Sequence, residues 1–98
     1  MCGAVEGGLS LDGVNLAKEA VIQGRVLRDG EPVGTAYVRL LDRSGEFTAE
    51  VPTSDEGAFR FFAGDGEWTL RTLAPKADVV DTRVVASVGS VVEVTVTL

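Results

Sequence analysis

The stretch Gly57–Leu73, GAFRFFAGDGEWTLRTL, decides the predicted fold because it holds four of the chain's six aromatic residues. Two pairs of large apolar side chains are spaced by two positions, as they are when they share one face of an extended strand: Phe59 with Phe61, and Trp68 with Leu70. The Ala-Gly-Asp-Gly run between them can take the positive φ angles of a tight reversal. The stretch therefore predicts a β-hairpin whose aromatic face builds the core.

Alternation of apolar and polar residues outside this stretch predicts five further strands. They fall at Val21–Leu27, Ala36–Leu41, Phe47–Val51, Val79–Ala86 and Val92–Leu98. In the third of these segments we expect Phe47, Ala49 and Val51 to share one face. No helical periodicity of useful length separates the strands. We therefore predict an all-β fold, a seven-stranded antiparallel β-sandwich.

The amino-terminal residues differ in composition from the remainder of the chain. Residues 1–20 carry four of the 12 glycines and no sustained apolar period. We expect a flexible, Gly-rich N-terminal arm over residues 1–20. Residues 21–98 are expected to form a single β-sandwich domain, since a chain of 98 residues suffices for one core.

The charge balance argues against two classes of partner. The 15 Asp and Glu residues outnumber the 9 Lys and Arg residues, which gives a formal charge of -6. Such a chain repels phosphate backbones and anionic lipids, so neither nucleic acid nor a membrane is an expected partner. No apolar run approaches the length of a membrane span, and we expect a cytoplasmic location.

The supply of reactive side chains argues against an enzyme. The chain has no histidine and one cysteine, Cys2, which removes His-dependent nucleophiles, His-ligated zinc and an internal disulfide. Asp55, Glu56 and Asp65 lie where turns favour acidic residues, and they lack the spacing of a calcium loop. We expect a non-catalytic protein with no cofactor and no metal site.

Five segments resemble the carboxypeptidase regulatory-like, transthyretin-type sandwich. They are Val21–Val26, Asp29–Val33, Ala36–Leu40, Gly57–Phe61 and Gly66–Leu70. This resemblance implies a fold and no function. The same fold hosts a ureide hydrolase that uses histidines, and a chain without histidine is not expected to share that activity.

A narrower resemblance covers nearly the whole chain. Met1–Gly3, Tyr37–Asp42, Gly45–Val51, Phe59–Ala63 and Trp68–Arg71 resemble a small actinobacterial family of unassigned function, sometimes labelled a sulfur-metabolism protein. Members of that family are typically encoded beside a rhodanese-type thiosulfate sulfurtransferase. The resemblance implies an accessory or partner protein of that enzyme, and it supplies no catalytic residue.

Cys2 is the one side chain that could take part in sulfur chemistry directly. Removal of Met1 would leave its thiol beside the α-ammonium group, which lowers the pKa of a thiol and favours the reactive thiolate. As a flexible chain, the roughly eighteen residues before the first strand would span about 20 to 25 Å. Our hypothesis is that Cys2 accepts sulfur from the sulfurtransferase. The alternative is that Cys2 lies in a tail without chemical role.

A second class of function needs no sulfur on the protein. A β-sandwich can act as an interaction or scaffold module that binds through a face or an edge, and exposed Val residues or Tyr37 could mark such a surface. Exposed strand edges also leave a homodimer open.

Overall fold

The computed structural model describes residues 3–4 and 19–98. Its strands are β1 (Gly3–Ala4), β2 (Ala20–Arg28), β3 (Glu31–Pro32), β4 (Tyr37–Leu41), β5 (Phe47–Pro52), β6 (Ala58–Ala63), β7 (Gly66–Leu73), β8 (Val80–Ala86) and β9 (Val91–Thr97). The seven predicted strands correspond to β2 and β4 to β9. For the five strands with predicted limits, each end agrees with the structure to within one residue. The two-residue strands β1 and β3 were not predicted.

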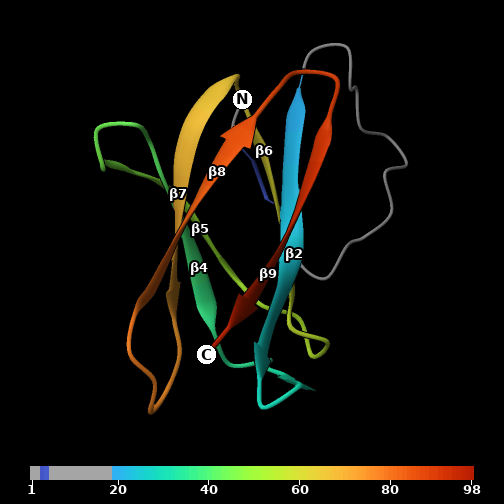
Figure 1. Cartoon of the computed structure of the whole chain (residues 1–98), viewed down its shortest axis with the longest axis vertical. Helices are drawn as coiled ribbons and strands as arrows, with labels where there is room; N and C mark the ends of the chain where they lie inside the picture. Colours follow the sequence, from blue (N-terminus) through green and yellow to red (C-terminus); the bar gives the residue numbers. More distant parts are fainter. Residues whose placement is uncertain (1–2, 5–18) are drawn as a thin grey trace.

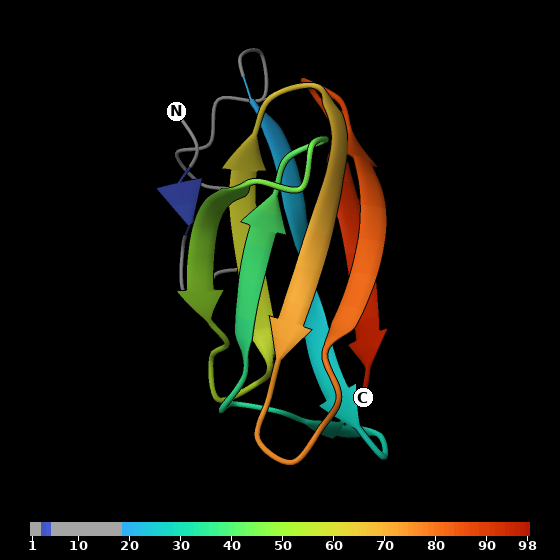
Figure 2. The same ribbon diagram turned by 90° about the vertical axis from the view of Figure 1, so that its left-hand side faces the viewer.

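Two sheets form the layers of a β-sandwich. Sheet A has the order β1-β6-β2-β3, with β9 also paired to β2, and sheet B has the order β5-β4-β7-β8. Figure 1 views the two layers from the side, and Figure 2 turns sheet B toward the viewer. The described residues contain no helix, and in particular none that could cross a bilayer. The prediction of an all-β sandwich is confirmed.

The prediction that all neighbouring strands are antiparallel is wrong at one place. β9 pairs with β2 in parallel, from Val21 opposite Val91 to Leu27 opposite Thr97. The reason is that β8 belongs to sheet B, and the chain crosses to sheet A before β9 begins. Alternation of side chains along a strand is the same in both kinds of pairing, so the sequence pattern carried no sign of this difference.

The predicted central hairpin is also wrong. The chain reverses at Gly64–Asp65, but β6 pairs with β1 and β2 in sheet A, whereas β7 pairs with β4 and β8 in sheet B. The connection is therefore an arch between the layers. The Trp68 indole Nε1 donates a hydrogen bond of 3.0 Å to the Gly64 carbonyl oxygen and so braces the arch. As a result, Phe59 and Phe61 of β6 lie across the core from Trp68 of β7, instead of beside it in the same sheet.

The core lies between the sheets. Phe59 and Phe61 are at most 1% exposed, and their ring centroids are 6.2 Å apart. Leu70 and Val38 from sheet B belong to the same buried cluster, and Trp68 packs against it while remaining half-buried. The expected inward positions of the aromatic stretch are thus confirmed, although they come from two different sheets.

Part of the expected N-terminal arm is paired in a sheet. Gly3 lies opposite Phe62 and Ala4 opposite Phe61 as β1 joins the edge of sheet A. These two residues do not behave as a free chain. β2 begins at Ala20, one residue inside the expected arm. Residues 1–2 and 5–18 of the arm, and with them Cys2, lie outside the described residues. The domain boundary at residue 21 stays a prediction.

Gly24 on β2 marks a close approach of two backbones. A Cβ atom at this position would lie 1.8 Å from the carbonyl oxygen of Val94 on the paired strand β9. That separation is far below a van der Waals contact, so the strands would have to move apart.

We expect Gly24→Ala to destabilise the domain by at least about 2 kcal/mol, because the added methyl group overpacks two paired strands. Chemical denaturation measures the free energy of unfolding. Gly64→Ala is the matched control, since a Cβ there meets nothing within 4 Å. Equal effects of the two substitutions would contradict the close approach.

Thr72 on β7 buries a hydroxyl group without a partner. Its side chain is fully buried on the inward face, and Oγ1 forms no hydrogen bond with any residue that the structure describes. A buried polar group in this state costs free energy of folding.

We therefore expect Thr72→Val to stabilise the domain by up to about 1 kcal/mol, since valine fills nearly the same space without the hydroxyl group. The midpoint of urea unfolding should rise. Thr82→Val on β8, a half-buried inward position, is a suitable comparison and should change the midpoint less. A loss of stability in Thr72→Val would mean that the hydroxyl group has a partner.

Candidate interaction surface

The outward positions of sheet B form a surface that Figure 2 shows facing the viewer. Alternation along each strand sets its composition: Val38, Leu40 and Leu70 point into the core, so their neighbours point outward. We call this surface the sheet-B face. Its strand residues are Tyr37, Arg39, Leu41, Phe47, Glu50, Pro52, Glu67, Thr69, Arg71, Leu73, Asp81, Arg83 and Val85.

Phe47 reaches this face through a β-bulge. Leu40 pairs with Ala49 but the next residue, Leu41, pairs with Phe47, so one residue of β5 is left over between them. The extra residue turns Phe47 to the side opposite Ala49. The expectation that Phe47 shares a face with Ala49 and Val51 is therefore wrong. The Phe47 side chain is 62% exposed instead of lying in the core.

Large apolar side chains gather on the sheet-B face. Five large hydrophobic residues are exposed in the described part of the chain. Three of them occupy outward strand positions: Tyr37, Phe47 and Val85. A fourth, Val79, directly precedes β8, the strand at one edge of the face. Val88, in the turn before β9, is the fifth. The four on the face are 51 to 65% exposed. The strand register places Tyr37 and Val79 toward one end of the face, and Phe47 and Val85 toward the other.

A row of charged residues crosses the middle of the face. The ladder places Glu50 beside Arg39, Arg39 beside Arg71, and Arg71 beside Asp81. Arg39 donates from Nε to Glu50 Oε2, and Arg71 donates from Nε and Nη2 to the two oxygens of Asp81 at 2.9 and 3.0 Å. Two like charges side by side are unfavourable, and the flanking carboxylates offset this repulsion.

The Arg71–Asp81 ion pair shifts the pKa values of both of its members. The hydrogen bond from Arg71 lowers the pKa of the Asp81 carboxyl group, and the same bond raises the pKa of Arg71. Because the folded-state pKa of Asp81 is lowered, its contribution to stability is present above the unfolded pKa of about 3.9 and disappears as the pH falls through the folded value. The charge row is therefore intact at neutral pH.

The outward side of sheet A offers less exposed surface. Val21 and Ala58 are fully buried there, and Arg60 is 2% exposed. Arg60 donates from Nε to Gln23 Oε1 at 2.9 Å, and Gln23 donates from Nε2 to Glu93 Oε1 at 3.1 Å. This side is occupied at its centre by a polar network, so the sheet-B face is the better candidate for a binding surface.

The structure describes some of the candidate residues from the sequence analysis but not Cys2. Cys2 lies outside the described residues, and its role as a sulfur acceptor stays a prediction. Tyr37 is exposed on the sheet-B face, and its role in a partner surface stays a prediction. Asp65 accepts a hydrogen bond from the Val88 backbone N–H, which fits the predicted turn role. No cluster of metal-ligating side chains occurs in residues 3–4 and 19–98.

Sequence reasoning missed Phe47 and the charge row. The bulge that exposes Phe47 leaves no mark in the alternation of β5. The sequence could not show that Arg71 stands between Arg39 and Asp81, because that depends on the order of strands in sheet B.

We expect Asp81→Asn to lower the free energy of unfolding at pH 7 relative to Asp78→Asn, because only the former substitution breaks an ion pair with Arg71. Asp78 forms no ion pair within the described part of the chain. The difference should shrink between pH 7 and a pH below the lowered folded-state pKa of Asp81, where its carboxyl group is protonated in the native chain as well. Denaturation midpoints at the two pH values test this, and a difference independent of pH would contradict it.

Comparisons with known proteins agree with this fold and leave the activity open. Two uncharacterized proteins of Mycobacterium tuberculosis, Rv0814c and Rv3118, are each 58% identical over 76 residues, which is 76% of this chain and 76% of each relative. An uncharacterized protein of Mycolicibacterium smegmatis is 60% identical over 63% of this chain and 70% of the relative.

A solved structure is similar in fold alone. The crystal structure of a DUF3823 family protein from Parabacteroides merdae superposes with a TM-score of 0.58 at 19% identity, and the match covers 83% of this chain and 46% of that one. The chain thus spans about half the length of that structure. The family described as "Protein of unknown function (DUF1416)" matches residues 2–98. With the match extending over nearly its whole length, this chain belongs to the DUF1416 family.

Proposed function

We propose that the chain is a non-catalytic interaction module that binds a protein partner through the sheet-B face. The observation that carries this proposal is the exposure of Tyr37, Phe47, Val79 and Val85 on one face, on both sides of the charge row. Aromatic residues and arginine are the types enriched at protein interfaces, and the face combines them. Its strand positions carry three arginines and three carboxylates, so the face is neutral in a chain whose formal charge is -6.

The charge row favours a different protein over a second copy of this chain. The row has the sign order minus, plus, plus, minus, which is unchanged when it is reversed. A two-fold related copy laid over the face with its strands aligned would bring Arg against Arg and carboxylate against carboxylate. A complementary partner would instead present carboxylates to Arg39 and Arg71, with apolar side chains around them.

The partner that we propose is a rhodanese-type thiosulfate sulfurtransferase, on the strength of the family resemblance in the sequence. The transthyretin-type assignment of the sandwich and the cytoplasmic location are parts of the same proposal. Within it, Cys2 is the candidate sulfur acceptor. Its thiolate would attack the outer sulfur of a persulfide on the partner, so that an S–S bond forms at Cys2, the partner's S–S bond breaks and the partner's thiolate leaves.

Binding is tested by titrating the purified chain with a rhodanese-type thiosulfate sulfurtransferase from the same organism. We expect Tyr37→Ser and Phe47→Ser each to weaken binding by about tenfold or more, as loss of an aromatic residue buried in an interface does, without a change in thermal stability. Val88→Ser is the matched control, because Val88 is exposed and apolar but lies outside the sheet-B face. Equal binding by all three variants would place the interface elsewhere, and no binding by the native chain would overturn the proposed partner.

Sulfur transfer has a separate test. Intact-mass spectrometry after incubation with thiosulfate and the sulfurtransferase should show one added sulfur atom on the native chain and none on Cys2→Ser. No added sulfur in a mixture where the proteins still bind would leave the interaction module and remove the carrier role. Sedimentation of the chain alone would reveal a homodimer, the competing occupant of the face.

A further inference from the structure

β8 is an edge strand of sheet B, since it pairs with β7 on one side only, and Figure 2 shows it at the outer side of the sheet. Its seven residues pair with β7 without a register shift. No other backbone hydrogen bond joins Val80–Ala86 to the part of the chain that the structure describes. In an antiparallel ladder, alternate residues direct their N–H and C=O groups away from the partner strand. β8 therefore presents a straight row of donors and acceptors to which a further strand can pair.

The sequence of this edge is symmetric about Thr82. Residues 79–85 read VVDTRVV, so two valines lie at each end, and the central threonine separates an aspartate from an arginine. When two copies of β8 pair antiparallel about a two-fold axis at Thr82, Asp81 of each copy lies opposite Arg83 of the other. The valines at one end of each copy lie opposite the valines at the other end of its mate. Each side chain thus meets one of matching type.

This register is the one that brings opposite charges together. An axis at Asp81 or at Arg83 would place two like charges directly opposite each other. An axis between two residues would place inward side chains opposite outward ones, which a continuous sheet does not allow. Cross-strand pairs of opposite charge and pairs of threonines stabilise a sheet, whereas like charges directly opposite destabilise it. The sequence of β8 therefore favours one symmetric pairing over its alternatives.

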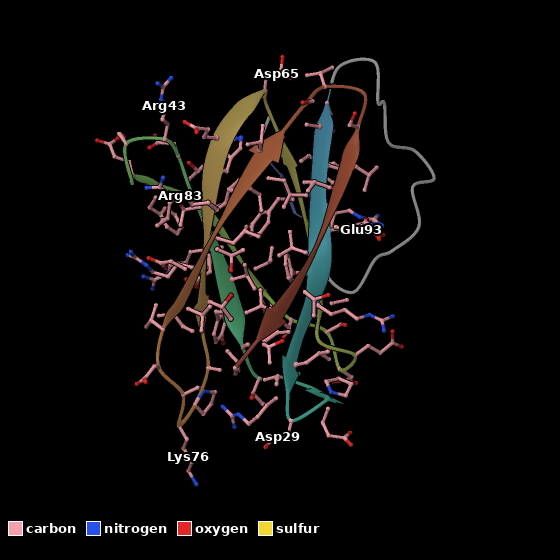
Figure 3. All side chains as sticks on the ribbon, viewed as in Figure 1. Asp29, Arg43, Asp65, Lys76, Arg83 and Glu93 are labelled. Atoms are coloured by element: carbon pink, nitrogen blue, oxygen red, sulfur yellow. The ribbon has the colours of Figure 1, made fainter. Side chains whose placement is uncertain are left out.

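The side chains of the edge are available for this pairing. Val79 and Val85 are 54% and 65% exposed. Arg83 has no carboxylate within 4 Å in the part of the chain that the structure describes, and Figure 3 shows it on the outward side of sheet B. Asp81 already accepts hydrogen bonds from Arg71, but a carboxylate can accept further bonds from a second guanidinium group. The symmetric pairing would thus cover two exposed valines and match an unpaired cation.

The other long edges lack this symmetry. β5, at the opposite edge of sheet B, has a bulge in its pairing and ends at Pro52, which has no N–H to donate. β9 pairs with β2 alone, at the edge of sheet A. Each of these strands carries a single charged residue, Glu50 in β5 and Glu93 in β9. Self-pairing of either strand therefore brings no opposite charges together.

We propose that two copies of this chain pair through β8 into a symmetric dimer with Thr82 at the two-fold axis. Antiparallel pairing puts the axis perpendicular to the sheet, so the two four-stranded B sheets join into one continuous sheet. Both sheet-B faces then point to the same side. The charge row argues against a copy laid over the face, whereas pairing at the edge leaves that face open for a different partner. The proposal thus goes beyond the proposed function, and its failure would leave that function untouched.

Sedimentation equilibrium of the isolated chain tests the dimer. We expect the native chain to shift from monomer to dimer as its concentration rises. Arg83→Asp should raise the dissociation constant of the dimer by about tenfold or more, because both symmetric charge pairs become repulsive. Arg25→Asp on β2, at an exposed arginine of sheet A, makes the same change in net charge and should leave the constant unchanged. Phe47→Ser should also leave it unchanged, since Phe47 lies on the face and not at this edge.

A mixing experiment tests the register. Asp81→Arg alone and Arg83→Asp alone each place like charges opposite each other across the axis. A mixture of the two variants places opposite charges at both pairs, so a heterodimer should form with about the native affinity. Thermal unfolding of each variant reports whether it is folded.

Hydrogen exchange of the native chain provides a measurement that needs no substitution. Alternate amides of Val80–Ala86 should exchange more slowly at high than at low protein concentration, and the amides of β5 should not change. The proposal is overturned by a native chain that stays monomeric at every concentration up to millimolar, or by a dimer that Arg83→Asp leaves intact. A dimer that Phe47→Ser disrupts, or folded variants that form no heterodimer when mixed, would overturn it as well.

Discussion

The arch that carries the chain from β6 to β7 is the constraint on which the sandwich depends. It moves the aromatic-rich stretch from one sheet to the other, so Phe59 and Phe61 pack against residues of sheet B instead of lying in one layer with them. The Trp68 indole hydrogen bond to Gly64 fixes the reversal. The buried area of these aromatics is the main source of stability, since burial of large apolar side chains dominates the free energy of folding.

The arch also determines which side chains lie on the proposed binding surface. Because the inward side chains of β7 lie in the core, its other side chains point outward. The pairing of β7 with β4 and β8 then brings Arg39, Arg71 and Asp81 into one row. The bulge in β5 adds Phe47 to the same side. The composition of the proposed binding surface on sheet B is thus a consequence of how the core is closed.

The two outward faces of the sandwich differ in the exposure and type of their side chains. On sheet A, the outward residues Val21 and Ala58 are buried, and a polar network runs from Arg60 through Gln23 to Glu93. On sheet B, apolar and charged side chains are exposed together. An interface needs apolar area that can be removed from water and polar groups that orient a partner, and the sheet-B face supplies both.

The sequence by itself determined the all-β class and nearly all strand limits, because alternation of apolar residues and turn formers are local properties. It also determined that Phe59, Phe61 and Leu70 are core residues. Only the tertiary structure decided that β6 and β7 lie in different sheets, that β2 and β9 run parallel, and that Phe47 is exposed. The physical reason is that strand order, strand direction and bulges are set by pairing between distant segments, whereas a period of two is identical for every partner that a strand could take.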